Sequence, residues 1–478
     1  MRARQIRALV QKWFGKSEVD LREVSRSAVE NLFRARLPRT PFMVSVVLWI
    51  LEKHREPRAL NRATLMEQFT MLLLERLRAD EALSATFDFR HKEAFLEHLA
   101  ELMSRNNQFT LTPDEYDALA HHYFRDKGFE APESFLDLSF AGGILCQARD
   151  LVYFRYRCFE EFYCAKAMLR RPEFLDYVTG EQRYLRFDAE IDLYSGLLRD
   201  CSLLLDQLGG RVDALVSALP TASLSMLDDM EAKDVAAAVL DDVGLQGFQV
   251  SDEQHDAILD ATEEIGEEQT EPKKEPTEVE SQCFGALYLY GHVLRNCEML
   301  TRAEKYGALE RCIQGFLVLL AGFEQDASVQ ASRLKEPARS EAQYFCRVVV
   351  PVLMQMIITD SLGTPKLDSQ FRRLAQSTPS LFIQFVLVCV LGDMRLAKYF
   401  YEFEEFIGRT GREKKSLLSM TFLKLLAYYT QRHYDRADRE RLESLIADVY
   451  LKIKDLPKRA KTEVLSRLRR QYKPASAD

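Results

Sequence analysis

The chain has 478 residues, which exceeds the usual size of one hydrophobic core, so about two to four domains are expected. A hydrophobic content of 47% and a charged content of 29% are ordinary for a soluble globular protein. The formal net charge of −8 gives no support to general binding of nucleic acid or membranes.

Metal binding and the cellular compartment can be judged from the cysteines, the histidines and the N-terminal segment. Nine Cys stand singly without CxxC spacing, and eight His show neither HxxxH nor HExxH spacing. We therefore expect reduced core thiols and no metal site. The N-terminal segment is amphipathic, unlike a signal peptide, and the longest apolar runs, such as residues 41–51, are too short to span a bilayer. A cytoplasmic protein that does not enter membranes is expected.

Residues 1–108 are predicted to form a helical domain. Ile6, Leu9, Val10, Trp13 and Phe14 follow helical spacing and make one apolar face. Further helices are predicted over about residues 20–35, from Pro41 after the N-cap Thr40, after the N-cap Asn61, and over residues 95–103.

Residues 109–172 carry a different pattern, which is compatible with a winged-helix-like module. Residues 112–115 read as a capping box that opens a helix to about Phe124, and a second helix begins near Ser134. Two short strands, 144–146 and 152–157, are predicted around a turn at 148–150, because apolar and charged side chains alternate in the second one. A helix follows at once.

The remaining residues are predicted to be helical apart from one linker. Residues 173–261 are interpreted as a helical connector. Residues 262–281 contain eight Glu and two Lys, a net charge of −6, and too few apolar side chains to offset their ordering entropy, so a disordered linker is predicted. Residues 283–473 are predicted to form a block of helices typical of an α-solenoid, although no strict sequence period is present. The expected fold class is mainly α with one short β-hairpin.

The tripeptide Gly15-Lys16-Ser17 has the ending of a phosphate-binding loop, GxxxxGK[ST]. Such a loop needs an earlier glycine, where this chain has Val10, and a preceding strand, where this chain has an amphipathic helix. Gly15 is therefore predicted to end a helix. No Ser-His-Asp, Cys-His or paired-carboxylate arrangement stands out, so no enzymatic activity is predicted.

Two further segments each have a structural and a functional interpretation. In residues 154–168, Phe159, Phe162 and Tyr163 predict core packing, while Glu160 and Glu161 lie in a first helical turn, where the helix dipole favours carboxylates.

Residues 456–473 hold seven basic residues and one Glu. A solvated face of a capping helix is favoured over an anionic partner there, because aromatic side chains that would stack on bases are nearly absent.

Three stretches in fixed order resemble the NACHT family of STAND signalling NTPases. QIRALVQKWFG, residues 5–15, resembles the helix after the nucleotide-binding core of the family. Residues 37–77, which begin LPRTPFMVSVVLWIL, are similar to its helical-domain signature, and VYFRYRCFEEFYCAKAML, residues 152–169, is similar to its winged-helix ending. FDAEIDLYSGLLRD, residues 187–200, is also similar to bacterial members.

The resemblance implies a mechanism in which ADP holds a nucleotide-binding core closed against the helical and winged-helix domains. A C-terminal sensor then binds a trigger, ATP replaces ADP, and the molecule oligomerises to activate an effector. Pro41 matches the helical-domain proline near adenine, and Tyr156 stands where the family has a His that meets the β-phosphate. A phenol donates one hydrogen bond but carries no positive charge. Because Walker A and Walker B motifs are not in the sequence, ATP or ADP is expected only with a separate P-loop domain.

We therefore expect a non-catalytic regulatory and sensor polypeptide of a NACHT-like STAND system, with bacterial anti-phage defence as the setting that the resemblance implies. The expected partners are a protein trigger or partner subunit and a P-loop NTPase polypeptide from an adjacent gene. Nucleic acid is not expected as a partner. Two alternatives stay open: a free-standing helical-repeat scaffold for protein–protein interaction, and a DNA-binding regulator that uses the winged helix.

Overall fold

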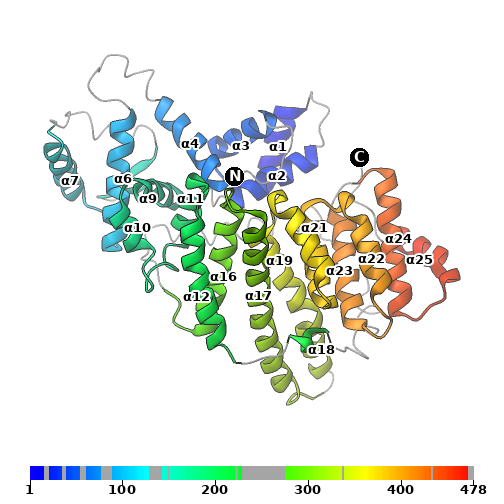
Figure 1. Cartoon of the computed structure of the whole chain (residues 1–478). Coiled ribbons are helices and arrows are strands. Elements are labelled where there is room, and N and C mark those ends of the chain that lie inside the picture. The colour runs from blue at the N-terminus through cyan, green and yellow to red at the C-terminus, as the bar shows by residue number, and fades with distance from the viewer. Residues whose placement is uncertain are drawn as a thin grey trace. The chain divides into compact units, whose positions relative to one another are not determined.

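The structure is a computed structural model that describes residues 1–15, 21–34, 39–53, 61–76, 89–128, 143–148, 150–220, 224–228, 275–335, 338–431 and 434–471. It divides into two compact units. Unit 1 comprises Met1–Asp200 with Asp252–Glu275, and unit 2 comprises Cys201–Ser251 with Pro276–Asp478. The described residues are mainly helical and contain one short antiparallel hairpin, so the expected fold class is confirmed (Figure 1).

Four helices open unit 1: α1 (Ala3–Phe14), α2 (Leu21–Arg34), α3 (Pro41–Lys53) and α4 (Arg62–Arg76). Helix α1 packs against α2 and α3, and its residues Ile6, Val10 and Phe14 are buried. Trp13 departs from the predicted apolar face, because its side chain is 37% exposed and its indole Nε1 donates to Glu52 Oε2 at 3.0 Å. The indole N–H thus holds this ring at the edge of the packed face.

The middle of unit 1 contains α6 (Phe89–Asn106), α7 (Pro113–Asp126), β1 (Leu145–Ala148) and β2 (Leu151–Phe154). The predicted capping box of α7 is confirmed, since Thr112 Oγ1 accepts from Glu115 N at 3.3 Å and Glu115 Oε2 accepts from Thr112 N at 2.8 Å. Leu111 forms an antiparallel bridge with Val152, through backbone hydrogen bonds of 2.9 and 2.7 Å. The order across the sheet is therefore Leu111, β2, β1.

The hairpin pairs Leu145 with Phe154 and Ala148 with Leu151. Asp150 in its turn has a φ of 60°, in the left-handed region that Asp adopts more readily than most residues. The second strand ends earlier than predicted, because Tyr156 is already the N-cap of the next helix. The helix predicted near residue 134 lies outside the described residues, as does most of the linker predicted over residues 262–281.

Unit 1 ends with α9 (Arg157–Arg170), α10 (Pro172–Val178) and α11 (Asp188–Leu198). Helix α9 is the centre of this part of the unit, since it packs against α4, α6, α10, α11 and β2. Every residue from position 158 to position 165 is buried. A helix covered on all sides cannot show the one-sided apolar pattern of a surface helix.

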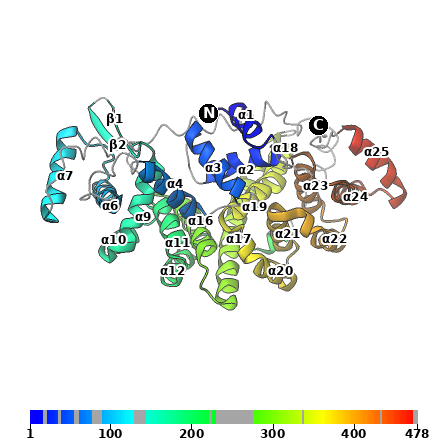
Figure 2. The same ribbon diagram turned by 90° about the horizontal axis from the view of Figure 1, so that it is seen from above.

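Unit 2 consists of helices that pack largely against their neighbours in the chain. Its helices are α12 (Ser202–Ala218), α13 (Ser225–Asp228), α16 (Val279–Asn296), α17 (Arg302–Ala331), α18 (Ala338–Tyr344), α19 (Val350–Leu362), α20 (Asp368–Ser377), α21 (Leu381–Arg395), α22 (Phe400–Arg409), α23 (Lys415–Gln431), α24 (Arg436–Ile453) and α25 (Lys461–Gln471). The packed pairs include α12 with α16, α16 with α17, α20 with α21, and α23 with α24. Figure 2 shows the resulting succession from α12 to α25.

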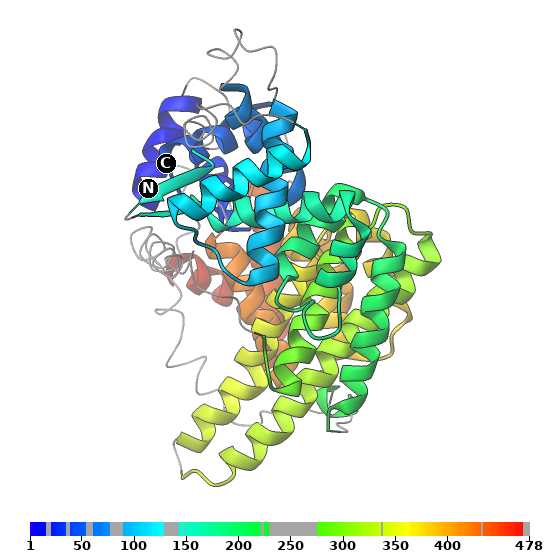
Figure 3. The same cartoon turned by 90° about the vertical axis from the view of Figure 1, so that its left-hand side faces the viewer.

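Helix α17 and the following segment form a long hairpin, which we call the α17/α19 hairpin. Its second arm joins α18 to α19 through the π-helix Phe345–Val349. Pro351 near the start of α19 has no backbone N–H to donate into the preceding turn, which accounts for the local widening of the helix. Figure 3 shows the two arms side by side, with their turn at the lower end of the picture.

Both arms of this hairpin have the length and apolar composition of a membrane-crossing helix. An 18-residue stretch has a mean hydropathy of 1.2 within Arg302–Ala331 and of 1.5 within Glu341–Leu362. Core helices of soluble proteins pass the same test, so the composition alone decides nothing.

Candidate functional site

The two residues predicted to meet a nucleotide, Pro41 and Tyr156, lie on elements with different packing partners. Pro41 is the exposed first residue of α3, where Thr40 Oγ1 accepts from Met43 N at 3.1 Å, and α3 packs on α1 and α2. Tyr156 caps α9, and its ring centroid lies 5.7 Å from that of Phe159. Burial raises the pKa of the Tyr156 phenol, so this group stays a neutral donor. A nucleotide role for either residue stays a prediction.

The start of α9 is buried, although it carries two glutamates. Glu160 and Glu161 are 1% and 3% exposed, so both carboxylates lie inside unit 1 among the aromatic side chains of the same helix. The helix dipole alone does not compensate a charge removed from water to this degree. Each carboxylate therefore needs its own partners, and the structure supplies them from other elements.

Arg62 links three segments that are far apart in the sequence. Its Nη2 donates to Glu161 Oε2 at 2.5 Å, and its Nη1 lies 3.7 Å from Asp192 Oδ2 of α11. All three side chains are buried. The only signals in the sequence were the carboxylates set in the apolar stretches of residues 159–163 and 187–193, and they did not indicate Arg62 as the partner.

Glu160 is held by a second set of groups. Ser104 Oγ of α6 donates to Glu160 Oε1 at 2.6 Å, and Arg157 Nε lies 3.3 Å from Glu160 Oε2. The Arg157 guanidinium also lies over the Phe109 ring, 3.4 Å from its centroid. The adjacent glutamates of α9 therefore hold different elements: Glu161 holds α4, and Glu160 holds α6.

A candidate ligand set for a metal ion surrounds Glu160. One carboxylate oxygen each from Glu160 and Glu190 and the Sγ of Cys164 lie within 4.8 Å of one another, and all three residues are buried. A thiolate with carboxylates is a donor set that suits Zn²⁺. However, Ser104 and Arg157 already engage Glu160, and Ser104 Oγ also lies 3.6 Å from Cys164 Sγ. The group is accounted for as a polar contact inside the helical core.

A ladder of ion pairs joins α6 to α9 beside this cluster. Glu93, Glu97 and Glu101 repeat every four residues on α6 and face basic residues of α9 and of Arg171 just after it; the pairs are Lys166–Glu93, Arg170–Glu97 and Arg171–Glu101. Burial raises the pKa of Glu97 to about 7, against the attraction of Arg170 at 3.1 Å. The Glu97 carboxyl therefore takes up a proton at a higher pH than an exposed glutamate does.

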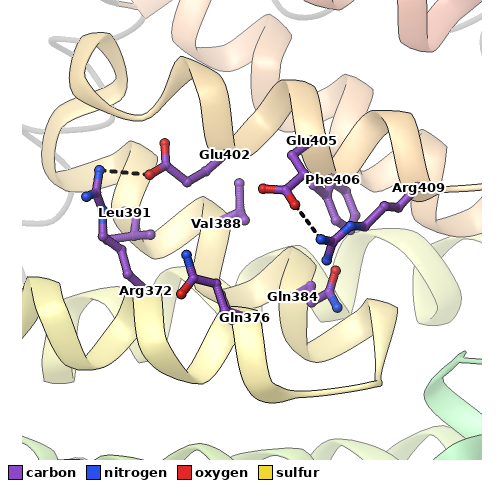
Figure 4. A pocket seen from close by; sticks show the side chains of 10 residues that line it. Arg372, Gln376, Gln384, Val388, Leu391, Glu402, Glu405, Phe406 and Arg409 are labelled. Atoms are coloured by element: carbon purple, nitrogen blue, oxygen red, sulfur yellow. Dashed lines mark hydrogen bonds and ion pairs between the residues drawn. The ribbon is translucent and has the colours of Figure 1, made fainter.

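Unit 2 contains a shallow groove between α20 and α22, with α21 as its floor (Figure 4). Its floor includes Val388, Leu391 and Phe406. On its rim, Arg372 Nη2 lies 2.8 Å from Glu402 Oε1, and Arg409 pairs with Glu405. Because both rim glutamates are held by arginines, the groove is a contact surface with an apolar floor, and its lining offers no poised acid or base.

The two remaining motifs have structural explanations for their described residues. Gly15 is the C-cap of α1, as predicted, whereas Lys16 and Ser17 lie outside the described residues. In the basic C-terminal stretch, Lys461 Nζ donates to Asp448 Oδ1 at 2.7 Å and Arg469 Nη2 to Glu443 Oε2 at 2.6 Å. These bonds and the buried Leu468 dock α25 on α24.

Comparison with known proteins found no relative of this chain. The chain matches no family model, no curated protein and no solved structure. The function of the chain is therefore inferred from its motifs and from the geometry of its two units.

Proposed function

We propose that the chain is the non-catalytic regulatory and sensor portion of a NACHT-like STAND signalling system, acting in the cytoplasm. In this proposal, unit 1 is the part that contacts a nucleotide-binding polypeptide, and unit 2 binds a protein trigger. The setting of bacterial defence comes from the resemblance of the motifs.

The observation that carries the proposal is the connectivity around the hairpin. A winged helix runs helix, short strand, two helices and a two-stranded wing, and its first strand pairs with the last one. Here α6 is followed by Leu111, α7 and the hairpin, and Leu111 pairs with β2, the last strand. This order supports a winged-helix module that begins with α6, earlier than the predicted start at residue 109. The module ends in α9, where the resemblance also expects the ending of the winged helix.

The sensor assignment is supported by the packing within unit 2. Successive helices pack on their chain neighbours, which is the arrangement of an α-solenoid. Stacked helix pairs present extended surfaces, and the groove of α20, α21 and α22 is one apolar hollow on such a surface. These features favour recognition of a macromolecule over turnover of a small substrate.

A binding experiment with the full chain tests the first half of the proposal. Titration calorimetry with ATP and with ADP should give no binding to the chain alone, because its sequence contains no phosphate loop. Co-expression with a P-loop NTPase polypeptide from the adjacent gene should give a complex whose stability depends on ADP. Micromolar affinity for ATP in the chain alone, or a complex indifferent to ADP, would contradict the proposal.

A DNA-binding regulator is the second candidate, because the same connectivity around β2 is used by winged helices that read DNA. Fluorescence anisotropy with random duplex DNA separates the two functions. Binding that weakens steeply with added salt would favour the regulator. The NACHT-like proposal expects no binding at physiological salt. A free-standing scaffold would show neither DNA binding nor ADP-dependent association.

A further inference from the structure

The α17/α19 hairpin exposes an apolar stripe along its second arm. Phe345, Leu353 and Met356 are 50%, 47% and 51% exposed, although all three are large apolar side chains. With the half-buried Val349 they are spaced by four, four and three residues, which places them on one helical face. The opposite face carries Val348 and Ile358, which are fully buried in unit 2.

The first arm also exposes apolar side chains, in its half nearer the turn of the hairpin. Phe323 and Val329 lie in the C-terminal half of α17, and Leu334 lies in the turn that follows. Scattered single apolar residues are normal on a protein surface. Six large ones on one hairpin, three of which share one helical face with Val349, exceed such scatter and call for a partner.

The exposed Asp326 lies three residues from both Phe323 and Val329, so the surface is most apolar along the second arm. Glu324 of α17 is 1% exposed, and the positive charge of Arg347 in the π-helix favours its ionised form. At the turn, residues 332–340 contain Arg333, Lys335 and Arg339 against Glu336, a net charge of +2, and Glu341 follows on the second arm. Arg333, Lys335 and Arg339 are exposed.

We propose that the α17/α19 hairpin docks on an anionic lipid surface, with the apolar stripe of its second arm and the basic residues of its turn in contact with the lipid. An 18-residue stretch of each arm has the hydropathy of a membrane helix, and 50% of that stretch in the first arm and 33% in the second arm are buried. Basic side chains beside exposed apolar ones suit the boundary between lipid headgroups and acyl chains. The expectation of no membrane contact rests on the net charge and on the length of apolar runs, and neither of them detects apolar side chains that lie three or four residues apart on one helical face.

The attachment is peripheral because the base of the hairpin is fixed within unit 2. Gln355 Nε2 of α19 donates to Asp393 Oδ2 of α21 at 2.9 Å, and Lys424 of α23 lies 2.9 Å from the same oxygen. Gln355 and Lys424 are buried in unit 2, and their contacts with Asp393 would have to be broken before the arm could cross a bilayer. The inference depends on unit 2 alone and goes beyond the proposed function.

Flotation of the full chain with vesicles tests the proposal. One set contains phosphatidylcholine alone, and the other contains phosphatidylcholine and phosphatidylglycerol. The chain should float with the anionic set. The double variant Phe345→Ser/Met356→Ser should bind these vesicles at least about tenfold more weakly, because both side chains lose their apolar contact with the lipid. Arg333→Glu/Lys335→Glu should lose the preference for anionic vesicles.

The matched control is Leu203→Ser on α12, which removes a side chain of the same unit that is 85% exposed but lies on another helix. It should float like the parent chain, and circular dichroism should show all variants folded. Failure to float with either vesicle set, or equal flotation of the double variant, would overturn the proposal. So would an oligomer without lipid that Phe345→Ser/Met356→Ser dissociates, since a second copy of the chain would then cover the stripe.

Discussion

Replacing Arg62 should strongly lower the free energy of unfolding of unit 1. Arg62 holds two buried carboxylates, Glu161 and Asp192, which would be left without this counter-charge. Because an isolated buried charge is far less stable than a buried pair, Arg62→Met should lower the free energy of unfolding by about 3–5 kcal/mol. Urea unfolding followed by circular dichroism measures this loss.

Two further variants separate charge from packing at this position. Arg62→Met/Glu161→Gln should recover part of the lost stability, because the double variant no longer buries the Glu161 charge. Arg436→Ala, which breaks the exposed pair with Glu440 on α24, should leave the unfolding curve unchanged. If Arg62→Met behaves like Arg436→Ala, the buried contacts described for Arg62 are wrong.

Glu324 should make the stability of unit 2 depend on pH. Burial raises the pKa of this carboxyl from 4.5 to about 7. Since the folded pKa is the higher one, its contribution to stability is complete below about pH 4.5 and is lost as the pH rises toward 7, a change of about 3 kcal/mol at most. Glu324→Gln should flatten this part of the profile. Glu341→Gln, an exposed glutamate of the neighbouring arm, is the control, and equal profiles for the parent and Glu324→Gln would refute the assignment.

At the scale of single elements, local signals predicted much and missed features that depend on contacts. The cap at Thr112 and the turn at residues 148–150 were predictable because their hydrogen bonds and dihedral angles are set within a few residues. The apolar pattern does not single out helix α20 within the predicted helical block, because its mostly polar sequence buries only Gln370, Phe371 and Leu374. Likewise, Glu160 and Glu161 are buried because residues of α6 and α4 bind their carboxylates. The sequence around the two glutamates does not reveal these distant partners.

Helix α1 offers a direct test of which aromatic residue holds it in place. The sequence pattern treats Trp13 and Phe14 alike, whereas in the structure Phe14 is buried and Trp13 is half exposed. Phe14→Ala should therefore destabilise unit 1 by about 3–5 kcal/mol. Trp13→Ala should cost about 1 kcal/mol, mainly through the lost bond to Glu52. Thermal melting of both variants decides, and a larger loss for Trp13→Ala would contradict the described packing.

Helices α4 and α11 approach each other at a glycine. A Cβ at Gly196 would lie 2.7 Å from Asn61 Oδ1 and 2.8 Å from Ala63 Cβ. The same Asn61 Oδ1 accepts from Ala63 N at the start of α4, so Gly196→Ala should disturb this cap and cost about 1–3 kcal/mol. Gly210→Ala on α12 is the control, because a Cβ there meets nothing within 4 Å. It should raise stability by about 0.5–1 kcal/mol through helix propensity, and the melting temperatures of the two variants should move in opposite directions.

At the scale of the whole molecule, the division between units follows contacts that are distant in the sequence. The sequence placed residues 173–261 in one connector, but α11 packs in unit 1 and α12 packs on α16 and α17 in unit 2. The approach of α12 is close, since a Cβ at Gly209 would lie 2.9 Å from Arg311 Nη1, and Arg311 Nε lies 3.1 Å from Asp213 Oδ1. Composition along the chain carries no trace of such a pairing, because α12 and α16 are separated by a long intervening segment.

This pairing predicts how the chain can be divided into stable fragments. Residues 201–478 should fold as one body, whereas residues 276–478 lack α12 and should expose the surfaces of α16 and α17 that it covers. Helix α12 buries four aliphatic side chains, Leu204, Leu205, Leu208 and Val212, each worth about 1.5–3 kcal/mol. The shorter fragment should therefore melt well below the longer one or aggregate, as seen by circular dichroism and size-exclusion chromatography. Adding residues 201–228 as a peptide should restore part of the difference, because the buried face of α12 remains complementary to its partners. Equal melting of the two fragments would show that α12 is dispensable to unit 2, and the boundary between the units would then lie after α12 instead of before it.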